Sequence, residues 1–88
     1  MHEDLETRRR RAAYRAAHRG SKEMDWLLGR FAASTLTGMS AATLERFEQL
    51  LALPDPDLQQ LILYPELGSP PASLRELIAG LRAFHGLD

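Results

Sequence analysis

Apolar residues recur along this chain three and four positions apart, which is the spacing of an amphipathic helix with one face in a core. No stretch of useful length alternates apolar and polar residues as a half-buried strand does. The pattern predicts an all-α fold, a small five-helix bundle with short loops. The apolar stripes are Met24, Leu27, Leu28 and Phe31; Leu44, Phe47, Leu50 and Leu51; Leu58, Leu61 and Ile62; and Leu74, Leu77, Ile78, Leu81 and Phe84.

The first predicted helix covers residues 4–18, where Arg and Ala dominate and neither Gly nor Pro interrupts. Its apolar side is thin, and the rest of its surface is strongly charged. Such a helix gains little from burial, so we expect it to dock loosely on the bundle and to fray at its start. The apolar side consists of Leu5, Ala12 and Ala16.

Glycine, proline and capping residues divide the chain into its helices. Gly20 suits a left-handed position that closes the first helix, and Ser21 can cap the second, which we expect to end near Leu36. The later signals are Ser40 as a cap, Pro54 as a stop, Asp55-Pro56-Asp57 as a cap and first turn, Pro65 as a stop, Ser73 with Glu76 or Ser69 before Pro70 as alternative starts of the last helix, and Gly86 as its end.

Length and composition limit what the chain can be. Eighty-eight residues suffice for one modest core, so we expect a single domain over residues 1–88. An apolar fraction of 44% and a charged fraction of 26% exclude a disordered chain. The lack of cysteine excludes disulfides, a thiolate nucleophile and cysteine metal sites. No apolar run approaches the roughly 20 residues of a membrane span, and the N-terminus has no signal-peptide core, so we expect a cytoplasmic protein.

The chain lacks the residue patterns of common catalytic and metal sites. His2, His18 and His85 lie far apart, and none has a second histidine or a carboxylate at ligand spacing on one helical face. There is no Gly-rich phosphate loop, nucleophile elbow or dinucleotide fingerprint, and the serines are better explained as helix caps or helix-end residues. We therefore expect neither a bound metal nor an independent enzyme.

Charge is distributed unevenly along the chain. Residues 1–30 hold eight Lys and Arg against five Asp and Glu, whereas residues 31–88 hold three against seven. The consecutive arginines Arg8 to Arg11 lie in the basic part, and the simplest interpretation is a solvated helical face. A nucleic-acid-binding regulator that uses Arg8 to Arg11 for phosphate contacts is the alternative function. The acidic remainder and the lack of a second basic helix argue against it.

The segment His18 to Phe31 carries a second pattern beside its apolar stripe. Glu23, Trp26 and Arg30 fall on the opposite side of the helix, and Arg19 extends that line if the helix reaches back so far. Glu23 also lies in the first turn, where the helix dipole favours a carboxylate. In one interpretation Trp26 packs in a second small core. In the other, an aromatic ring flanked by Arg and a carboxylate is a binding hot spot, and only this predicts an exposed Trp26.

Several motifs give the chain a resemblance to a known family. Arg19-Gly20-x-x-Glu23 is followed by Met24-Asp25 and by Leu27-Leu28-Gly29-Arg30-Phe31. The overall length, Leu50-Leu51 and the helix start Pro54-Asp55-Pro56-Asp57-Leu58 fit the same pattern. On these residues, which cover nearly the whole chain, the sequence resembles the succinate dehydrogenase assembly factors, also called flavinylation factors.

The resemblance implies a five-helix assembly factor, a chaperone without catalytic activity of its own. Such factors bind the flavoprotein subunit of succinate dehydrogenase, and in bacteria also of fumarate reductase, and promote covalent attachment of FAD to a histidine of that subunit. FAD is then the cofactor of the partner and is not stably bound by this chain. A monomer in the bacterial cytoplasm, acting without nucleic acid or a membrane, is the expectation that follows.

The resemblance also assigns the functional contact region, which maps to the face that the helical pattern left unexplained. Gly20 would let the backbone approach the flavoprotein closely, and Arg19 would offer charge-assisted hydrogen bonds. Glu23 would either bind a group of the partner or hold Arg19 in place. The full set of expected partner-binding residues is His18, Arg19, Gly20, Glu23, Trp26 and Arg30.

The sequence departs from the family pattern at three places. His18 stands where Arg is frequent, and Ser21 stands where Met is common; both changes lie beside the signature and could alter affinity. Gln59-Gln60 follow the start of the fourth helix where an aromatic residue is often found. The last change argues against a partner contact by the fourth helix.

Overall fold

The computed structural model describes residues 4–87, which contain five α-helices and three short 3-10 turns. The predicted all-α fold is therefore confirmed. The α-helices are α1 (Leu5–Ala17), α2 (Lys22–Thr35), α3 (Ala41–Leu51), α4 (Asp55–Leu63) and α5 (Arg75–Phe84). The 3-10 turns are η1 (Leu36–Gly38), η2 (Pro65–Leu67) and η3 (Ala72–Leu74).

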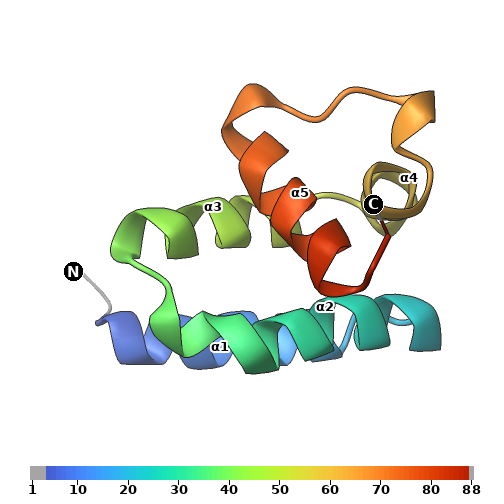
Figure 1. Ribbon diagram of the computed structural model, residues 1–88. Coiled ribbons are helices and arrows are strands. Elements are labelled where there is room, and N and C mark those ends of the chain that lie inside the picture. Colours follow the sequence, from blue (N-terminus) through green and yellow to red (C-terminus); the bar gives the residue numbers. More distant parts are fainter. Residues whose placement is uncertain (1–3, 88) are drawn as a thin grey trace.

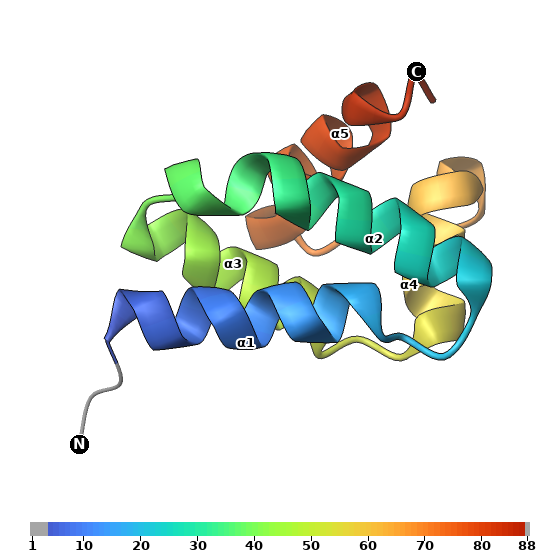
Figure 2. The same cartoon turned by 90° about the horizontal axis from the view of Figure 1, so that it is seen from below.

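α1 and α2 form an antiparallel pair and lie side by side in Figure 2. The two helices are close at Gly29, where a Cβ would lie 3.3 Å from the Cα of Ala17 and 3.4 Å from its Cβ. α3 packs on α1, α5 crosses over α2, and α4 is seen nearly end-on in Figure 1. The connector between α1 and α2 consequently meets the junction of α3 and α4 at one end of the molecule.

The predicted apolar stripes supply the core. Among the described residues no polar or charged residue is buried. The stripe of α5 fits least well, because Phe84 lies in its last turn at the edge of the core and is 42% exposed. The side chains that are buried most completely are Leu28, Leu44, Phe47, Leu50, Leu58, Ile62 and Leu81.

The predicted caps of the second and third helices are confirmed. Ser21 Oγ accepts a hydrogen bond from the N–H of Met24 at 3.2 Å, and Ser40 Oγ accepts one from the N–H of Thr43 at 3.1 Å. Gly20 has the predicted positive φ, but α1 already ends at Ala17. Gly20 therefore shapes the connector rather than closing α1 directly.

The start of α4 differs from the prediction. Pro54 takes the cap position, and Asp55 is the first residue of the helix. The carboxylate of Asp55 accepts a hydrogen bond from Arg19 at 2.9 Å instead of capping a backbone N–H. A tertiary contact has replaced the local one, and sequence spacing cannot reveal such an exchange.

The start of α5 was also predicted wrongly. The helix begins at Arg75, behind the turn η3, and no side chain caps either element. The N–H of Leu74 donates to the carbonyl of Pro71 at 2.9 Å. A backbone hydrogen bond of the 3-10 turn thus takes the place of a side-chain cap before α5. Neither Ser69 nor the pair of Ser73 and Glu76 acts as the predicted cap.

α1 is held more firmly than its composition predicts. Arg8 Nη2 lies 2.6 Å from Glu48 Oε1 on α3, and Arg9 Nη2 donates to the carbonyl of Met39 at 2.9 Å. The hydrogen bond between Arg8 and Glu48 lowers the pKa of the carboxyl and raises the pKa of the guanidinium. Of the arginine run only Arg10 is exposed, so the expectations of loose docking and of a solvated arginine face were wrong.

None of the helices within residues 4–87 has both the length and the apolar character that crossing a bilayer requires.

Candidate functional site

The connector between α1 and α2, residues 18–21, has a fixed backbone. Gly20 has φ +109°, a conformation that residues with a side chain rarely adopt. Oδ1 of Asp25, in the first turn of α2, accepts hydrogen bonds from the N–H of Arg19 and from the N–H of Gly20, the latter at 3.3 Å. A side chain of α2 therefore sets the position of the Arg-Gly pair.

The side chain of Arg19 is directed into the fold. Its Nε donates to Asp55 Oδ1 at 2.9 Å, its Nη2 donates to the carbonyl of Leu53 at 2.8 Å, and its Nη1 donates to the carbonyl of Leu51. The side chain is only 12% exposed. These contacts join the connector to the junction of α3 and α4, and they use all three guanidinium nitrogens.

These contacts decide two alternatives that the sequence left open for Arg19. Arg19 does not extend the line of residues on α2, because that helix begins at Lys22. Asp55, rather than Glu23, holds the guanidinium in place. A direct contact of Arg19 with a partner stays a prediction.

His18 is exposed beside the connector. Its ring stacks on Tyr14 with centroids 4.0 Å apart and an angle of 17° between planes. Its Nδ1 lies 2.8 Å from the carbonyl of Tyr14, and since a carbonyl can only accept, Nδ1 carries the hydrogen. The two rings border a shallow hollow of about 350 Å³, which is lined by Tyr14, Arg15, His18, Arg19 and Asp55.

Glu23 is exposed in the first turn of α2, as predicted. Gln59 of α4 donates from Nε2 to Glu23 Oε1 at 3.2 Å. Gln59, one of the two glutamines at which the sequence departs from the family pattern, therefore borders the expected contact region. The carboxylate keeps its second oxygen available for a further donor, since an ionised carboxylate accepts about four hydrogen bonds.

Trp26 is 52% exposed, so the interpretation that it packs in a second core was wrong. The guanidinium carbon of Arg30, one turn further along α2, lies 5.7 Å from the centroid of the Trp26 ring. Trp26 also contacts the ring of His85 at the end of α5, with ring centroids 4.8 Å apart. Glu23, Trp26 and Arg30 thus form an exposed strip along α2, which begins next to the Arg-Gly pair.

Three residues of this region were not recognised from the sequence. Asp25 fixes the connector, Asp55 holds Arg19, and His85 supports Trp26. Asp25 and Asp55 lie in the first turns of α2 and α4, where a carboxylate already has a local explanation. His85 lies 59 residues from Trp26 in the sequence, so no local pattern connects the two rings.

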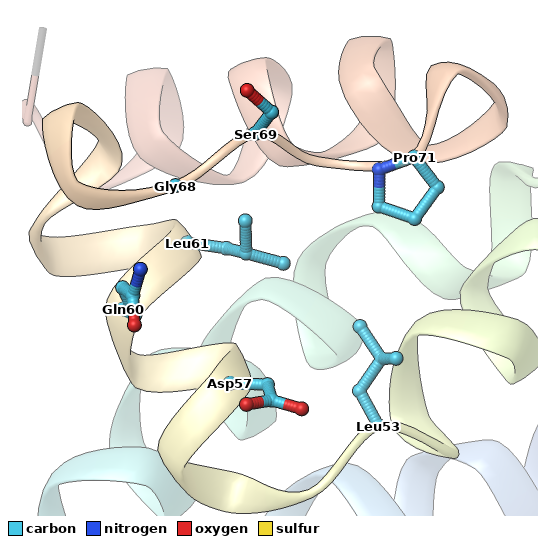
Figure 3. Close-up of a pocket in the computed structure, with 7 residues that line it drawn as sticks. All are labelled: Leu53, Asp57, Gln60, Leu61, Gly68, Ser69 and Pro71. Atoms are coloured by element: carbon cyan, nitrogen blue, oxygen red, sulfur yellow. The ribbon is translucent and has the colours of Figure 1, made fainter.

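A separate cavity lies between α4 and the loop that precedes α5 (Figure 3). Gln60 Nε2 donates to the carbonyl of Leu67 at 2.7 Å and ties this loop to the helix. The volume is about 230 Å³, below the roughly 300–1,000 Å³ of typical small-molecule sites. None of the predicted partner-binding residues lines the cavity, whose lining is Leu53, Asp57, Gln60, Leu61, Gly68, Ser69 and Pro71.

The other candidate chemistries find little support in residues 4–87. No group of three or more His, Asp or Glu in this range could hold a metal ion, and His2 lies outside it. Arg8 and Arg9 are engaged with α3 and with the carbonyl of Met39. The arginine run therefore does not present the continuous free basic surface on which the nucleic-acid alternative depends.

The fold and the strip define a class of protein. A rigid helical scaffold that exposes a tryptophan beside an arginine and a carboxylate has the composition of a protein-binding module. A model of the protein family described as Sdh5, flavinator of succinate dehydrogenase, matches residues 10–85. The chain belongs to this family, which confirms the resemblance drawn from the sequence.

Two relatives illustrate the similarity. The protein named FAD assembly factor SdhE from Acetobacter pasteurianus is 43% identical over 56 residues, which are 64% of this chain and 51% of that protein. Succinate dehydrogenase assembly factor 2, mitochondrial, from Meyerozyma guilliermondii is 41% identical over 56 residues, which are 64% of this chain and 42% of that protein. The chain thus spans about half the length of the curated relatives that it matches. No solved structure matches it significantly.

Proposed function

We propose that this protein binds the flavoprotein subunit of succinate dehydrogenase, and in a bacterium also that of fumarate reductase, and promotes covalent attachment of FAD to it. The family match over residues 10–85 supports the flavoprotein as partner. The name of the Acetobacter relative, an FAD assembly factor, supports the flavin as the group whose attachment is assisted. The protein acts as an assembly factor, and the chemistry takes place on the partner.

The observation that carries the proposal is the exposed strip of Glu23, Trp26 and Arg30 beside a connector whose backbone the fold has already fixed. A large aromatic ring in water is unfavourable for a free protein and becomes favourable when a partner covers it. Gly20 is exposed, and a Cβ built on it would meet nothing within 4 Å, so the backbone here is open to close approach.

The mechanism that fits this geometry is templating. Covalent attachment needs the reactive carbon of the flavin held close to the nucleophilic histidine of the partner, and a docked protein can raise the population of that arrangement without taking part in the chemistry. Gly20 allows the connector to lie flat on the partner. Glu23 accepts a hydrogen bond from it, and Trp26 with Arg30 supplies buried area.

FAD stays with the partner in this proposal. The hollows near the strip are shallow, and the cavity beside α4 is small and lies away from it. We also propose that the free protein is a monomer and acts in the bacterial cytoplasm, although the similar yeast proteins carry the word mitochondrial in their names.

Flavin fluorescence of the denatured partner tests the proposal. The flavoprotein subunit is expressed with and without this chain, denatured and separated by gel electrophoresis, and covalently bound flavin is read in the gel. We expect a strong band only when the chain is present. Equal signals in both samples would overturn the proposal.

A matched pair of variants ties the effect to the strip. Glu23→Gln removes the negative charge of the strip, whereas Glu45→Gln removes the charge of another exposed glutamate, on α3. We expect about a tenfold loss of covalent flavin for Glu23→Gln and little change for Glu45→Gln. Equal effects of the two variants would show that the strip is not the contact.

A further inference from the structure

The last turn of α5 and the middle of α2 together build one aromatic surface. The ring of His85 lies against Trp26, and Phe84 meets the same His85 ring edge-on, with centroids 4.9 Å apart and planes at 87°. Trp26 is 52% exposed and Phe84 is 42% exposed. We call the residues Trp26, Arg30, Phe84 and His85 the α2–α5 surface. It extends the strip on α2 to a helix that neither the sequence motifs nor the proposed function includes.

Hydrogen bonds to α2 and α4 hold the end of α5 in place under the α2–α5 surface. Nε2 of His85 lies 2.7 Å from the carbonyl of Leu27, so it carries the hydrogen and ties the end of α5 to α2. Arg82 donates to the carbonyls of Ile62 and Leu87, which ties the residues after α5 to α4. Rings that are ordered before binding lose less conformational entropy when a partner covers them.

A shallow hollow of about 540 Å³ opens beside the surface, one turn further along α2. Gly29 and Ala33 border it without bulky side chains, and Phe84 adds an aromatic ring to its lining. The hollow therefore suits an apolar side chain of a partner, seated against an aromatic ring. Its complete lining is Gly29, Arg30, Ala33, Ser34 and Phe84.

Arg30 supplies a charge at the border of this hollow. It is exposed, and within residues 4–87 it makes no hydrogen bond or ion pair, only the contact with the Trp26 ring at 5.7 Å. Its guanidinium rests on an aromatic face, which orients the N–H donors while leaving them unused. A planar carboxylate is the acceptor that such a fork fits best.

We propose that the contact with the flavoprotein subunit continues over the α2–α5 surface to the end of α5, and that the partner places an apolar side chain in the hollow and a neighbouring carboxylate on Arg30. The inference rests on the proposed function and extends it by including the end of α5 in the interface. Continuity with Glu23 on the same helix face supports the same partner. So does the clustering of aromatic residues and arginine, which dominate the energetic centres of protein interfaces.

The single tryptophan of this chain allows a direct test. Protein labelled with 5-fluorotryptophan gives one fluorine resonance, from position 26, and is titrated with the purified flavoprotein subunit. Complex formation is measured separately by co-elution in size-exclusion chromatography. We expect the resonance to shift or broaden in proportion to the complex. A complex that leaves the resonance unchanged would overturn this inference and the contact role given to Trp26, while the flavoprotein would remain the partner. The absence of any complex would overturn the proposed function itself.

Two matched pairs of variants separate direct contact from remote effects. Arg30→Glu is compared with Arg75→Glu, an exposed arginine at the other end of α5, and Phe84→Ala is compared with Leu67→Ala, which is 67% exposed. We expect Kd to rise about tenfold or more for Arg30→Glu and Phe84→Ala, and to change less than about twofold for the controls.

Two further results keep the test decisive. Phe84 also contacts Phe31, so Phe84→Ala can lower the stability, and its melting temperature is measured. If Phe84→Ala unfolds, the conclusion is drawn from Arg30→Glu. Equal Kd changes in variants and controls would overturn the proposal. A free dimer that Arg30→Glu dissociates would also overturn it, because the surface would then serve a second copy of this chain.

Discussion

Arg19 donates from Nε to Oδ1 of Asp55 at 2.9 Å, across 36 residues of sequence. This contact, with the bonds from Arg19 to the carbonyls of Leu51 and Leu53, joins the α1–α2 connector to the α3–α4 junction. The arginine of the Arg19-Gly20-x-x-Glu23 segment is thus tied into the fold, and the glycine and glutamate that follow it are exposed. Residues that are adjacent in a motif consequently have different physical roles.

Arg19→Ala should lower the free energy of unfolding by about 2 kcal/mol, because two carbonyls and a carboxylate lose a charged donor. Asp55→Ala should lower the free energy of unfolding by less than Arg19→Ala does. The double variant should lose less than the sum of the two single losses, since the two residues share one interaction. Urea unfolding at pH 7 measures all three, with Arg15→Ala as an exposed control within about 0.5 kcal/mol of the wild type. Additive losses would mean that the pair is not coupled.

Gly20→Ala should destabilise the protein by about 1 kcal/mol, because φ is +109° and a Cβ is strained there even with space around it. Gly20→Glu should fold with a similar penalty and lose flavoprotein binding, since its side chain blocks the close approach. Gly38→Ala is the control, as its Cβ also meets nothing within 4 Å and its φ is not positive. Thermal unfolding and a binding titration give the two readouts. Unfolding of both Gly20 variants would make Gly20 purely structural.

Gly29→Leu should lower the stability by about 1–3 kcal/mol, because a Cβ at this position lies 3.3 Å from the backbone of Ala17 and would push α1 away from α2. Gly80→Leu also replaces a glycine inside a helix, but a Cβ there meets nothing within 4 Å, so this variant should gain from its better helix propensity. Melting temperatures of the two proteins provide the comparison. A similar change in both would show that helix packing at Gly29 tolerates a side chain.

The ion pair between Arg8 and Glu48 should make stability depend on pH in the acid range. The hydrogen bond from Arg8 holds the pKa of Glu48 below its ordinary value of about 4.3, so the stabilisation is present above that pH and is lost as the pH falls through the folded-state pKa. Unfolding in urea at pH 7 and at pH 3 should therefore show a larger difference between wild type and Glu48→Gln at pH 7. A difference that stays constant with pH would contradict the assignment.

His85→Ala should release Trp26 from its support on α5. Acrylamide should then quench the tryptophan emission more strongly than in the wild type, and the near-ultraviolet circular dichroism should weaken, because the ring loses the aromatic neighbour that covers it. His18→Ala is the matched control, since its ring stacks on Tyr14 instead. Emission of the wild-type protein should already be red-shifted relative to a buried tryptophan, as the exposure of 52% requires.

Much of this fold follows from local chemistry in the sequence. The apolar spacing gave the helices and most of the core, and serine caps at Ser21 and Ser40 placed two helix starts correctly. Gly20 was recognised as the position of positive φ. Helical periodicity also placed Glu23 and Trp26 opposite the apolar stripe of their helix, but it left open whether Trp26 is exposed or packs in a second core.

Tertiary structure alone decided how those pieces are used. Asp55 has a local explanation as a cap, and only the arrival of Arg19 beside it turned the carboxylate into a tertiary anchor. The arginine run became part of the bundle because Glu48 and the carbonyl of Met39 lie within reach. His85 reaches Trp26 because α5 crosses α2. Periodicity reports which face of a helix is apolar, whereas the partner of a polar side chain depends on distances that exist only after the chain has folded.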